Sequence, residues 1–134
     1  FQGKAAGFDL RSGQRVWDHP TSSYQSLVAS REEIYLVDDK SRISALELKT
    51  GNPLWTQEAL LRRDLTAPAL SENRLVVADA EGYVFWLDRE TGQVMAQDRV
   101  DRQGISARPL ATGNGVVVIQ GRGGRLAALR IRRG

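Results

Sequence analysis

Three segments of the chain repeat one pattern: GFDLRSGQRVW (7–17), ALELKTGNPLW (45–55) and WLDRETGQVMA (86–96). Each contains an apolar residue, an acid, two variable positions, Ser or Thr, and then Gly. The three glycines, Gly13, Gly51 and Gly92, are 38 and 41 residues apart. In a turn of this kind glycine supplies a positive φ, and the neighbouring Ser, Thr or acid binds free backbone N–H groups. The pattern therefore predicts a tight turn between two strands in every repeat.

Two further sets of segments recur at the same period. The clearer set is IYLVDD (34–39), LVVADA (75–80) and VVVIQG (116–121), spaced by 41 and 41, and the looser set is SLVAS (26–30), APALS (67–71) and ARPLA (107–111). Short apolar runs rich in β-branched residues are typical of strands that are buried on both faces. Polar turns then lead to the segments 42–48 and 83–87, which predicts hairpins.

Four short antiparallel strands every ~40–45 residues are the spacing of a β-propeller blade. We therefore predict an all-β fold in which 134 residues supply about three and a bit blades. The expected boundaries are the end of one blade at 1–18, full blades at 19–58 and 59–99, and a final, incomplete blade at 100–134. Only EALLRRDL (58–65) has a pattern that suits a helical turn, and we interpret it as a connection between repeats.

Composition and charge exclude several classes of protein. The formal net charge is +3, but the last 13 residues hold five Arg and no acid, and the rest of the chain has 14 basic and 16 acidic residues. Basic character confined to one end does not indicate a nucleic-acid-binding face. The chain has no Cys, which excludes disulfides and thiolate metal sites. No apolar run is long enough for a membrane-spanning helix, and the first residues, FQGKAAGFDL, lack the basic-then-apolar pattern of a signal peptide.

No group of residues predicts catalysis. The single His, His19, follows Trp17 in the context DHPTS, which predicts a solvated loop. Asp18 and Ser22 would complete a Ser-His-Asp set only on paper, because close neighbours in sequence rarely reach the required geometry. We therefore expect neither catalytic residues nor a cofactor or metal site.

The remaining polar candidates also have structural interpretations. Recurrent acids lie in the turns or at strand ends, and we expect each to cap backbone donors in its own hairpin: Asp9, Glu47 and Asp88, with Asp38 and Asp79. GRGGR (121–125) lacks the Lys-Ser/Thr of a phosphate-binding loop and aligns with hairpin turns. The basic residues Arg62, Arg63, Arg130, Arg132 and Arg133 fit a solvated edge better than a contact with an acidic partner. Tyr83, Phe85 and Trp86 are expected in the core.

At DLRSGQRVW and ELKTGNPLW the sequence resembles the PQQ-like, or tryptophan-docking, repeat. The resemblance implies that Trp17 and Trp55 pack between neighbouring blades, with Gly13, Gly51 and Gly92 as repeat glycines. The third repeat departs from the pattern, since Ala96 stands at the Trp position after Met95. Trp86 aligns instead with Ala45 in the preceding strand, so this blade is expected to dock through other side chains.

Longer strings resemble the C-terminal part of the BamB family of propeller lipoproteins, above all LTAPAL (65–70) and LVVADAEGYVFWLD (75–88). The resemblance implies an eight-bladed propeller that acts as a non-enzymatic scaffold in the outer-membrane β-barrel assembly (BAM) complex. Its implied location is the periplasmic face of the outer membrane of Gram-negative bacteria. The main partner would be BamA, with unfolded outer-membrane proteins as further partners and no nucleic acid. Membrane attachment would need a lipid anchor that this sequence does not show, and no partner-binding residue is assigned.

Two other functions share the repeat. A quinoprotein dehydrogenase would bind pyrroloquinoline quinone and Ca²⁺ near the propeller axis, and a third class of propeller binds sugars or peptides. The absence of adjacent cysteines and of metal-ligand spacing disfavours the quinoprotein. Because about three blades leave apolar blade faces uncovered, we also expect this segment by itself to be poorly soluble, self-associating or covered by a partner chain.

Overall fold

The computed structural model describes residues 4–9, 14–20 and 24–131, and every regular element within these ranges is a β-strand. The strands are β1 (Lys4–Asp9), β2 (Gln14–Pro20), β3 (Tyr24–Ala29), β4 (Glu33–Asp38), β5 (Ile43–Glu47), β6 (Pro53–Gln57), β7 (Ala69–Ser71), β8 (Arg74–Ala78), β9 (Tyr83–Asp88), β10 (Val94–Arg99), β11 (Leu110–Ala111), β12 (Val117–Gln120) and β13 (Leu126–Leu129). Within the same ranges no helix is long and apolar enough to cross a membrane.

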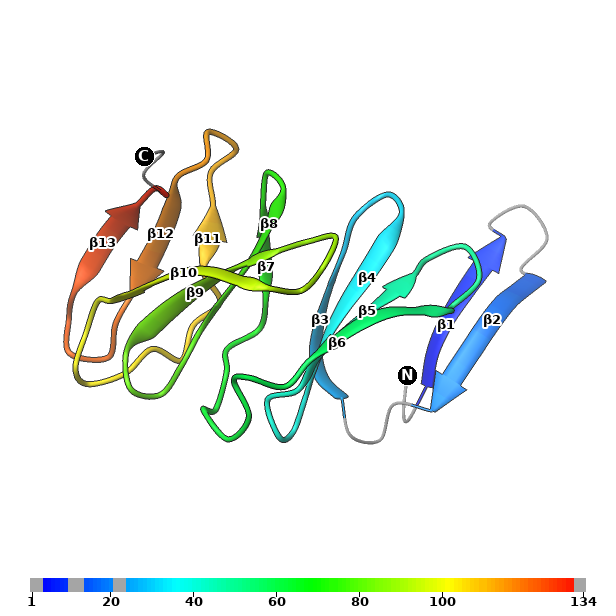
Figure 1. The fold of residues 1–134 in the computed structure, drawn as a ribbon, viewed down its shortest axis with the longest axis horizontal. Helices are drawn as coiled ribbons and strands as arrows, with labels where there is room; N and C mark the ends of the chain where they lie inside the picture. The colour runs from blue at the N-terminus through cyan, green and yellow to red at the C-terminus, as the bar shows by residue number, and fades with distance from the viewer. Residues whose placement is uncertain (1–3, 10–13, 21–23, 132–134) are drawn as a thin grey trace.

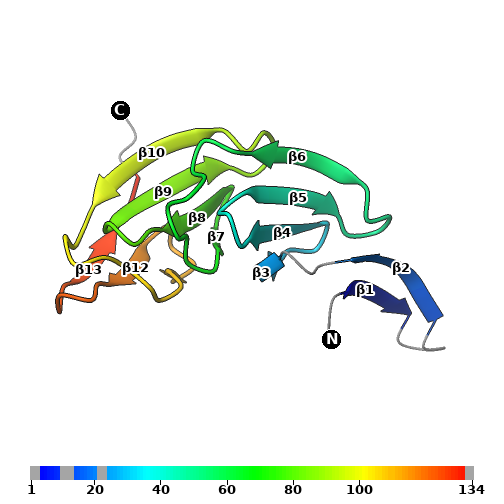
Figure 2. The ribbon, with the colours of Figure 1, turned by 90° about the horizontal axis from the view of Figure 1, so that it is seen from below.

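The strands form four antiparallel sheets that follow one another in chain order (Figure 1). They are β1–β2, β3–β4–β5–β6, β7–β8–β9–β10 and β11–β12–β13. Figure 2 shows β6 and β10 along one side of the molecule and β3 and β7 on the opposite side, so the two four-stranded sheets run from inner to outer strand in the same direction. The inner strands lie close together: β7 contacts β11, and Arg108 donates a hydrogen bond to the Leu27 carbonyl at 3.2 Å. This is the blade arrangement of a β-propeller, as predicted.

Burial explains the composition of the strands. In β4 and β8 the apolar residues are buried along the whole strand, because another sheet or connection covers each face. The outer strands β6 and β10 instead alternate exposed and half-buried residues, as expected for strands with one wet face. The apolar runs of the sequence therefore mark the central strands of each sheet.

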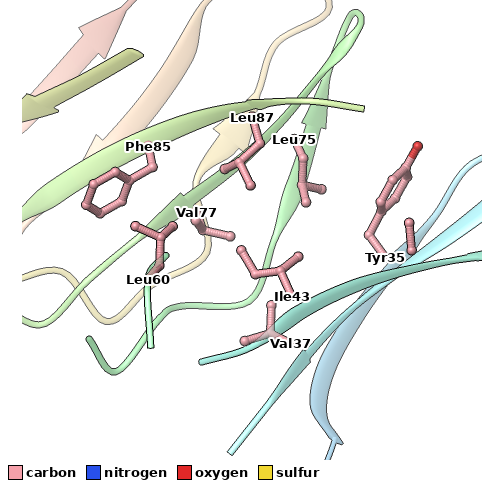
Figure 3. Packing of buried hydrophobic residues seen from close by; sticks show 9 residues of the cluster. Tyr35, Val37, Ile43, Leu60, Leu75, Val77, Phe85 and Leu87 are labelled. Carbon is pink, nitrogen blue, oxygen red and sulfur yellow. The ribbon is translucent and has the colours of Figure 1, made fainter. Parts of the chain in front are cut away.

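The largest core cluster lies between the β3–β6 and β7–β10 sheets (Figure 3). Its buried residues are Tyr35, Val37, Ile43, Ala45, Leu60, Leu75, Val77, Phe85 and Leu87. A second cluster joins the β7–β10 sheet to β11–β13 through Val76, Ala78, Val84, Trp86, Ile105, Val117 and Ile119. A third, smaller one packs Trp17 and Tyr24 against Ile34, Leu36 and Leu46. The core is thus a series of interfaces between sheets, and its stability depends on how each sheet docks on the next.

The connection 58–65 forms turns, with no helix. Its Leu60 is buried in the largest cluster, at 4% exposure. The chain passes between two hairpin turns, since the Arg62 N–H donates to the Lys40 carbonyl at 3.0 Å and the Ala80 N–H donates to the Arg63 carbonyl at 3.1 Å. The interpretation as a connection between repeats is confirmed.

The last repeat is shifted by one residue relative to the predicted alignment. Leu75 pairs with Leu87, and the corresponding pair is Val117 with Leu129, so that LVVA (75–78) matches VVIQ (117–120). The cause is the turn before the strand, which closes between Thr112 and Val116 where the preceding repeat closes between Ser71 and Arg74. The predicted spacing of 41 for this pair was therefore wrong by one, and Asp79 corresponds to Gly121.

Candidate functional site at the contacts between sheets

Trp17 joins the first sheet to the second. Its indole Nε1–H donates a hydrogen bond to the Leu48 carbonyl at 2.5 Å, and its ring lies over the turn at Gly51. Gly51 has φ = 76°, and a Cβ built there would lie 2.8 Å from Cδ2 of Trp17. The position requires glycine both for its backbone conformation and for its contact with the indole.

Trp55 makes the equivalent contact between the second and third sheets. Its Nε1–H donates to the Arg89 carbonyl at 2.8 Å. Gly92 has φ = 78°, and a Cβ there would lie 2.6 Å from Cδ2 of Trp55. The contact between the first and second sheets and the contact between the second and third sheets therefore use the same two residue types, a tryptophan and a glycine, at the equivalent turn. Gly13, the first glycine of the sequence repeat, lies outside the described residues.

A second side chain supports each tryptophan. His19 Nε2 lies 2.7 Å from the Gly51 carbonyl, and Gln57 Nε2 donates to the Gly92 carbonyl at 2.7 Å. Both residues follow their tryptophan by two positions and so lie on the same face of the strand. The prediction of a solvated loop His was wrong, because β2 extends to Pro20 and His19 is half-buried within it.

At the third interface, which lies between the third and fourth sheets, the tryptophan comes from a different strand. Trp86 of β9 pairs across the sheet with Ala96 of β10, whereas in the preceding sheet Ala45 of β5 pairs with Trp55 of β6. The two residue types are exchanged within one cross-strand pair. Trp86 is only 5% exposed and packs in the cluster between the third and fourth sheets. The cross-strand pair of Trp86 and Ala96 thus still supplies one indole that packs against the next sheet, but this indole comes from β9 and not from the outer strand β10.

A network of charged and polar side chains also joins the second and third sheets, at what we call the second interface. Arg89 Nη2 forms an ion pair with Glu33 Oε1 at 3.1 Å, and Arg89 Nε donates to the Tyr35 hydroxyl at 3.0 Å. Tyr35 in turn donates to Glu33 at 3.0 Å. Burial acts to raise the pKa of Glu33, but the hydrogen bonds from Tyr35, Arg89 and Ser30 outweigh it and lower this pKa. Burial also raises the pKa of Tyr35.

Three of the recurrent carboxylates, Asp38, Asp79 and Asp88, cap backbone donors of their own hairpins, as expected. Asp38 Oδ1 accepts the Lys40 and Arg42 N–H groups, both at 2.9 Å. Asp79 Oδ1 accepts the Glu81 N–H at 3.0 Å and the Tyr83 N–H at 2.9 Å. Asp88 and Glu47 make local bonds in the glycine turns, to the Glu90 N–H and the Thr50 hydroxyl respectively. Asp9 is described only through its backbone.

The remaining residues that the sequence offered as candidate sites have local structural roles or lie outside the described residues. GRGGR (121–125) closes a hairpin, in which the Gly121 N–H donates to the Arg125 carbonyl at 2.8 Å. Asp18 pairs with Arg15 at 3.0 Å and is not bonded to His19, while Ser22 lies outside the described residues. Within the described part of the chain, no group of three or more His, Asp or Glu side chains is placed to hold a metal ion. Arg132 and Arg133 lie outside the described residues, and Arg130 is exposed after β13.

Comparison of the sequence with known proteins identifies the family to which it is similar. The sequence profile of the family "Outer membrane protein assembly factor BamB" matches residues 1–57 and 54–134. The BamB of Escherichia coli (strain K12) is 39% identical over 129 residues, which are 96% of this chain and 33% of that protein. The BamB of Pseudomonas aeruginosa is 37% identical over 132 residues, which are 98% of this chain and 34% of that protein.

A solved structure agrees in fold. The crystal structure of BamB from Moraxella catarrhalis superposes with a TM-score of 0.83 at 23% identity, over 96% of this chain and 38% of that one. The chain spans about a third of the length of the curated relatives that it matches. With the profile matching along its whole length, the chain belongs to the family of the outer membrane protein assembly factor BamB.

Proposed function

We propose that this chain is part of a non-enzymatic scaffold subunit of the outer membrane β-barrel assembly complex. In this proposal the whole protein binds BamA and assists the insertion of outer-membrane β-barrel proteins, with unfolded client proteins as further partners. The observation that carries the proposal is the family match across residues 1–57 and 54–134. The proposed location is the periplasmic face of the outer membrane, where a lipid anchor would hold the whole protein.

The chemistry of the contacts between sheets supports a scaffold. The indole N–H groups of Trp17 and Trp55 are bonded to backbone carbonyls of the neighbouring sheet, and the Glu33–Arg89 pair joins two sheets as well. These polar groups are therefore used to orient successive sheets. A stack fixed in this way presents its turns and connections in constant relative positions, which suits a subunit that holds other proteins.

The proposed blade boundaries follow the sequence repeats. Residues 19–58 and 59–99 would each be one blade, 1–18 the end of an earlier blade, and 100–134 a final, incomplete one. The whole protein would close a ring of eight blades, as the family resemblance implies.

Affinity purification of the whole protein tests the function. The tagged protein is isolated from detergent-solubilised membranes of its own Gram-negative cell, and co-purifying proteins are identified by mass spectrometry. We expect BamA at a ratio close to one to one, and no enrichment of BamA with an equally tagged, unrelated outer-membrane lipoprotein. A preparation that retains other outer-membrane complexes but contains no BamA would contradict the proposal.

A further inference from the structure

A cleft of about 550 Å³ lies between the third and fourth sheets. Its walls come from the β7–β8 turn, the β11–β12 turn and the segment after β13. The charged residues that line it are Glu72, Arg74 and Arg130, and the apolar ones are Trp86 and Ile131. The volume is within the range of about 300–1,000 Å³ that is usual for sites that bind small ligands or single side chains.

The preceding repeat shows which charged side chains meet at the equivalent position. Glu33 pairs with Glu47 at the start of β4, and Arg74 pairs with Asp88 at the start of β8, so Glu33 and Arg74 are equivalent. At the second interface Glu33 faces Arg89 across the sheets, in an ion pair of 3.1 Å. A carboxylate and a guanidinium therefore meet at this position in the preceding repeat.

At the third interface both partners are different. Arg74 replaces the acid, and Ile131 stands where Arg89 stands in the third sheet, each two residues after a paired leucine. A guanidinium is still present, but it stands at the position of the acid, and the position of the arginine on the facing sheet holds the apolar Ile131. Among the described residues neither Arg74 nor Arg130 forms an ion pair.

Arg74 also leaves a buried donor without an acceptor. Its Nε is buried and has no hydrogen-bond partner within the described part of the chain. An unpaired buried N–H of a charged group is costly, and an acceptor that reaches the Arg74 side chain from the cleft would relieve this cost. Because two guanidinium groups and one carboxylate line the cleft, its net charge is +1, which suits a single carboxylate better than a doubly charged phosphate.

We propose that this cleft binds the carboxylate of an acidic side chain from a bound protein segment, with Arg74 as its main partner and Arg130 as a second donor. The carboxylate would take the role that Glu33 has at the preceding interface, while Trp86 and Ile131 contact the methylene groups of the incoming side chain. The inference is independent of the proposed function, because it rests on this interface alone and names no component of the assembly complex.

Nuclear magnetic resonance of the ¹⁵N-labelled protein provides the test, and the readout in the wild type and in every variant is the backbone N–H signal of Gly115, which lines the cleft. The probe is a capped peptide with one central glutamate, and its match is the same peptide with glutamine. We expect the glutamate peptide alone to shift this signal, with an affinity that falls as salt is raised. Arg74→Gln should weaken binding about tenfold or more, and Arg130→Gln should weaken it less.

Arg62→Gln is the matched control, since Arg62 is exposed on the connection between the second and third sheets and does not line this cleft. It should bind the peptide as the wild type does. Melting curves confirm that each variant folds, and Arg130→Gln, at an exposed position, keeps the test valid if Arg74→Gln does not fold.

Equal shifts with the glutamate and glutamine peptides would overturn the proposal. So would free acetate or phosphate that binds as tightly as the glutamate peptide, since the cleft would then be a site for small anions. Loss of BamA co-purification would not affect this result, so the two proposals fail separately.

Discussion

The carboxylate of Asp101 lies where a side chain at Gly121 would point. A Cβ built on Gly121 would be 2.6 Å from Cγ of Asp101, which itself is 5% exposed. Asp101 Oδ2 accepts the Gly123 N–H at 2.8 Å and the Arg125 N–H at 3.3 Å. In the two preceding hairpins the equivalent donors are bound by Asp38 and Asp79 from within the hairpin. The last hairpin has therefore lost its own acid, and the connection between the third and fourth sheets supplies one instead.

This relationship predicts a dependence of stability on pH. Hydrogen bonds from the backbone N–H groups, that of Gln103 first, lower the pKa of Asp101 below its ordinary value of 3.8. A lowered pKa in the folded state means that the ionised form stabilises the fold. That contribution is complete above the ordinary pKa and is lost as pH falls through the lower folded value. Melting temperature measured between pH 2 and 6 should fall less steeply at the acid end for Asp101→Asn than for the wild type.

Because Asp101 takes the place of an acid at position 121, moving the acid back to position 121 should restore stability that is lost when Asp101 is removed. Gly121→Asp should destabilise the protein, because two carboxylates would compete for one place. In an Asp101→Gly background the same Gly121→Asp change restores the arrangement of Asp79 and should recover stability. A double-mutant cycle by urea unfolding measures the coupling, which we expect to exceed about 1 kcal/mol. Simple additivity of the two changes would show that the two positions do not share a site.

The glycine turns predict a difference between two alanine substitutions. Gly92→Ala and Gly113→Ala both place a side chain at positive φ, 78° and 88° respectively. At Gly113 the new methyl meets nothing within 4 Å, whereas at Gly92 it collides with the ring of Trp55. Gly113→Ala should therefore cost about 1 kcal/mol of unfolding free energy, and Gly92→Ala about 1–3 kcal/mol more. Denaturant titration of both variants checks this, and equal costs would show that the indole contact is not tight.

The Glu33–Arg89 pair predicts a modest loss of stability on neutralisation. Both side chains are about a quarter exposed, at 24% and 23%, so solvent screens their attraction. Glu33→Gln should cost about 1 kcal/mol at neutral pH, chiefly through weaker hydrogen bonds to Tyr35 and Arg89. Since the pKa of Glu33 is lowered, the difference from wild type should shrink as pH falls below its ordinary value of 4.5. Glu32→Gln, at an exposed neighbouring residue, is the control and should leave unfolding unchanged.

Local patterns were sufficient to predict the strands, the turns and the sheet-by-sheet fold. Runs such as IYLV (34–37) are apolar because both faces of the strand are covered, and burial on both faces produces consecutive apolar residues in the sequence. The capping roles of Asp38 and Asp79 were likewise predictable, since donor and acceptor are four residues apart. These features depend on interactions within one hairpin, which periodicity and turn chemistry detect.

Features that depend on distant residues were not predictable in the same way. His19 meets Gly51, 32 residues away, and its neighbours in sequence favour a loop. The extra residue between Thr112 and Val116 moved the last strand by one position, which repeat spacing alone does not reveal. Asp101 replaces the acid missing at Gly121 from 20 residues upstream, and no hairpin rule points to it. Each of these compensates for a departure from the repeat, and the departure itself, a Gly at an Asp position, is the signal to search for a substitute.

The outer face of the last sheet predicts how the isolated chain behaves. Leu126 pairs with Gln120 at the position of Ile43 in the second sheet, yet it is 75% exposed where Ile43 is fully buried. Leu110 on the same sheet is 63% exposed. Because the equivalent face of an inner sheet is covered by the next sheet, we expect the chain to self-associate in solution. Leu126→Glu should reduce this association, and Met95→Glu, on the exposed edge strand of the third sheet, serves as the control. Light scattering against concentration measures both, and a monodisperse wild-type monomer would contradict the prediction.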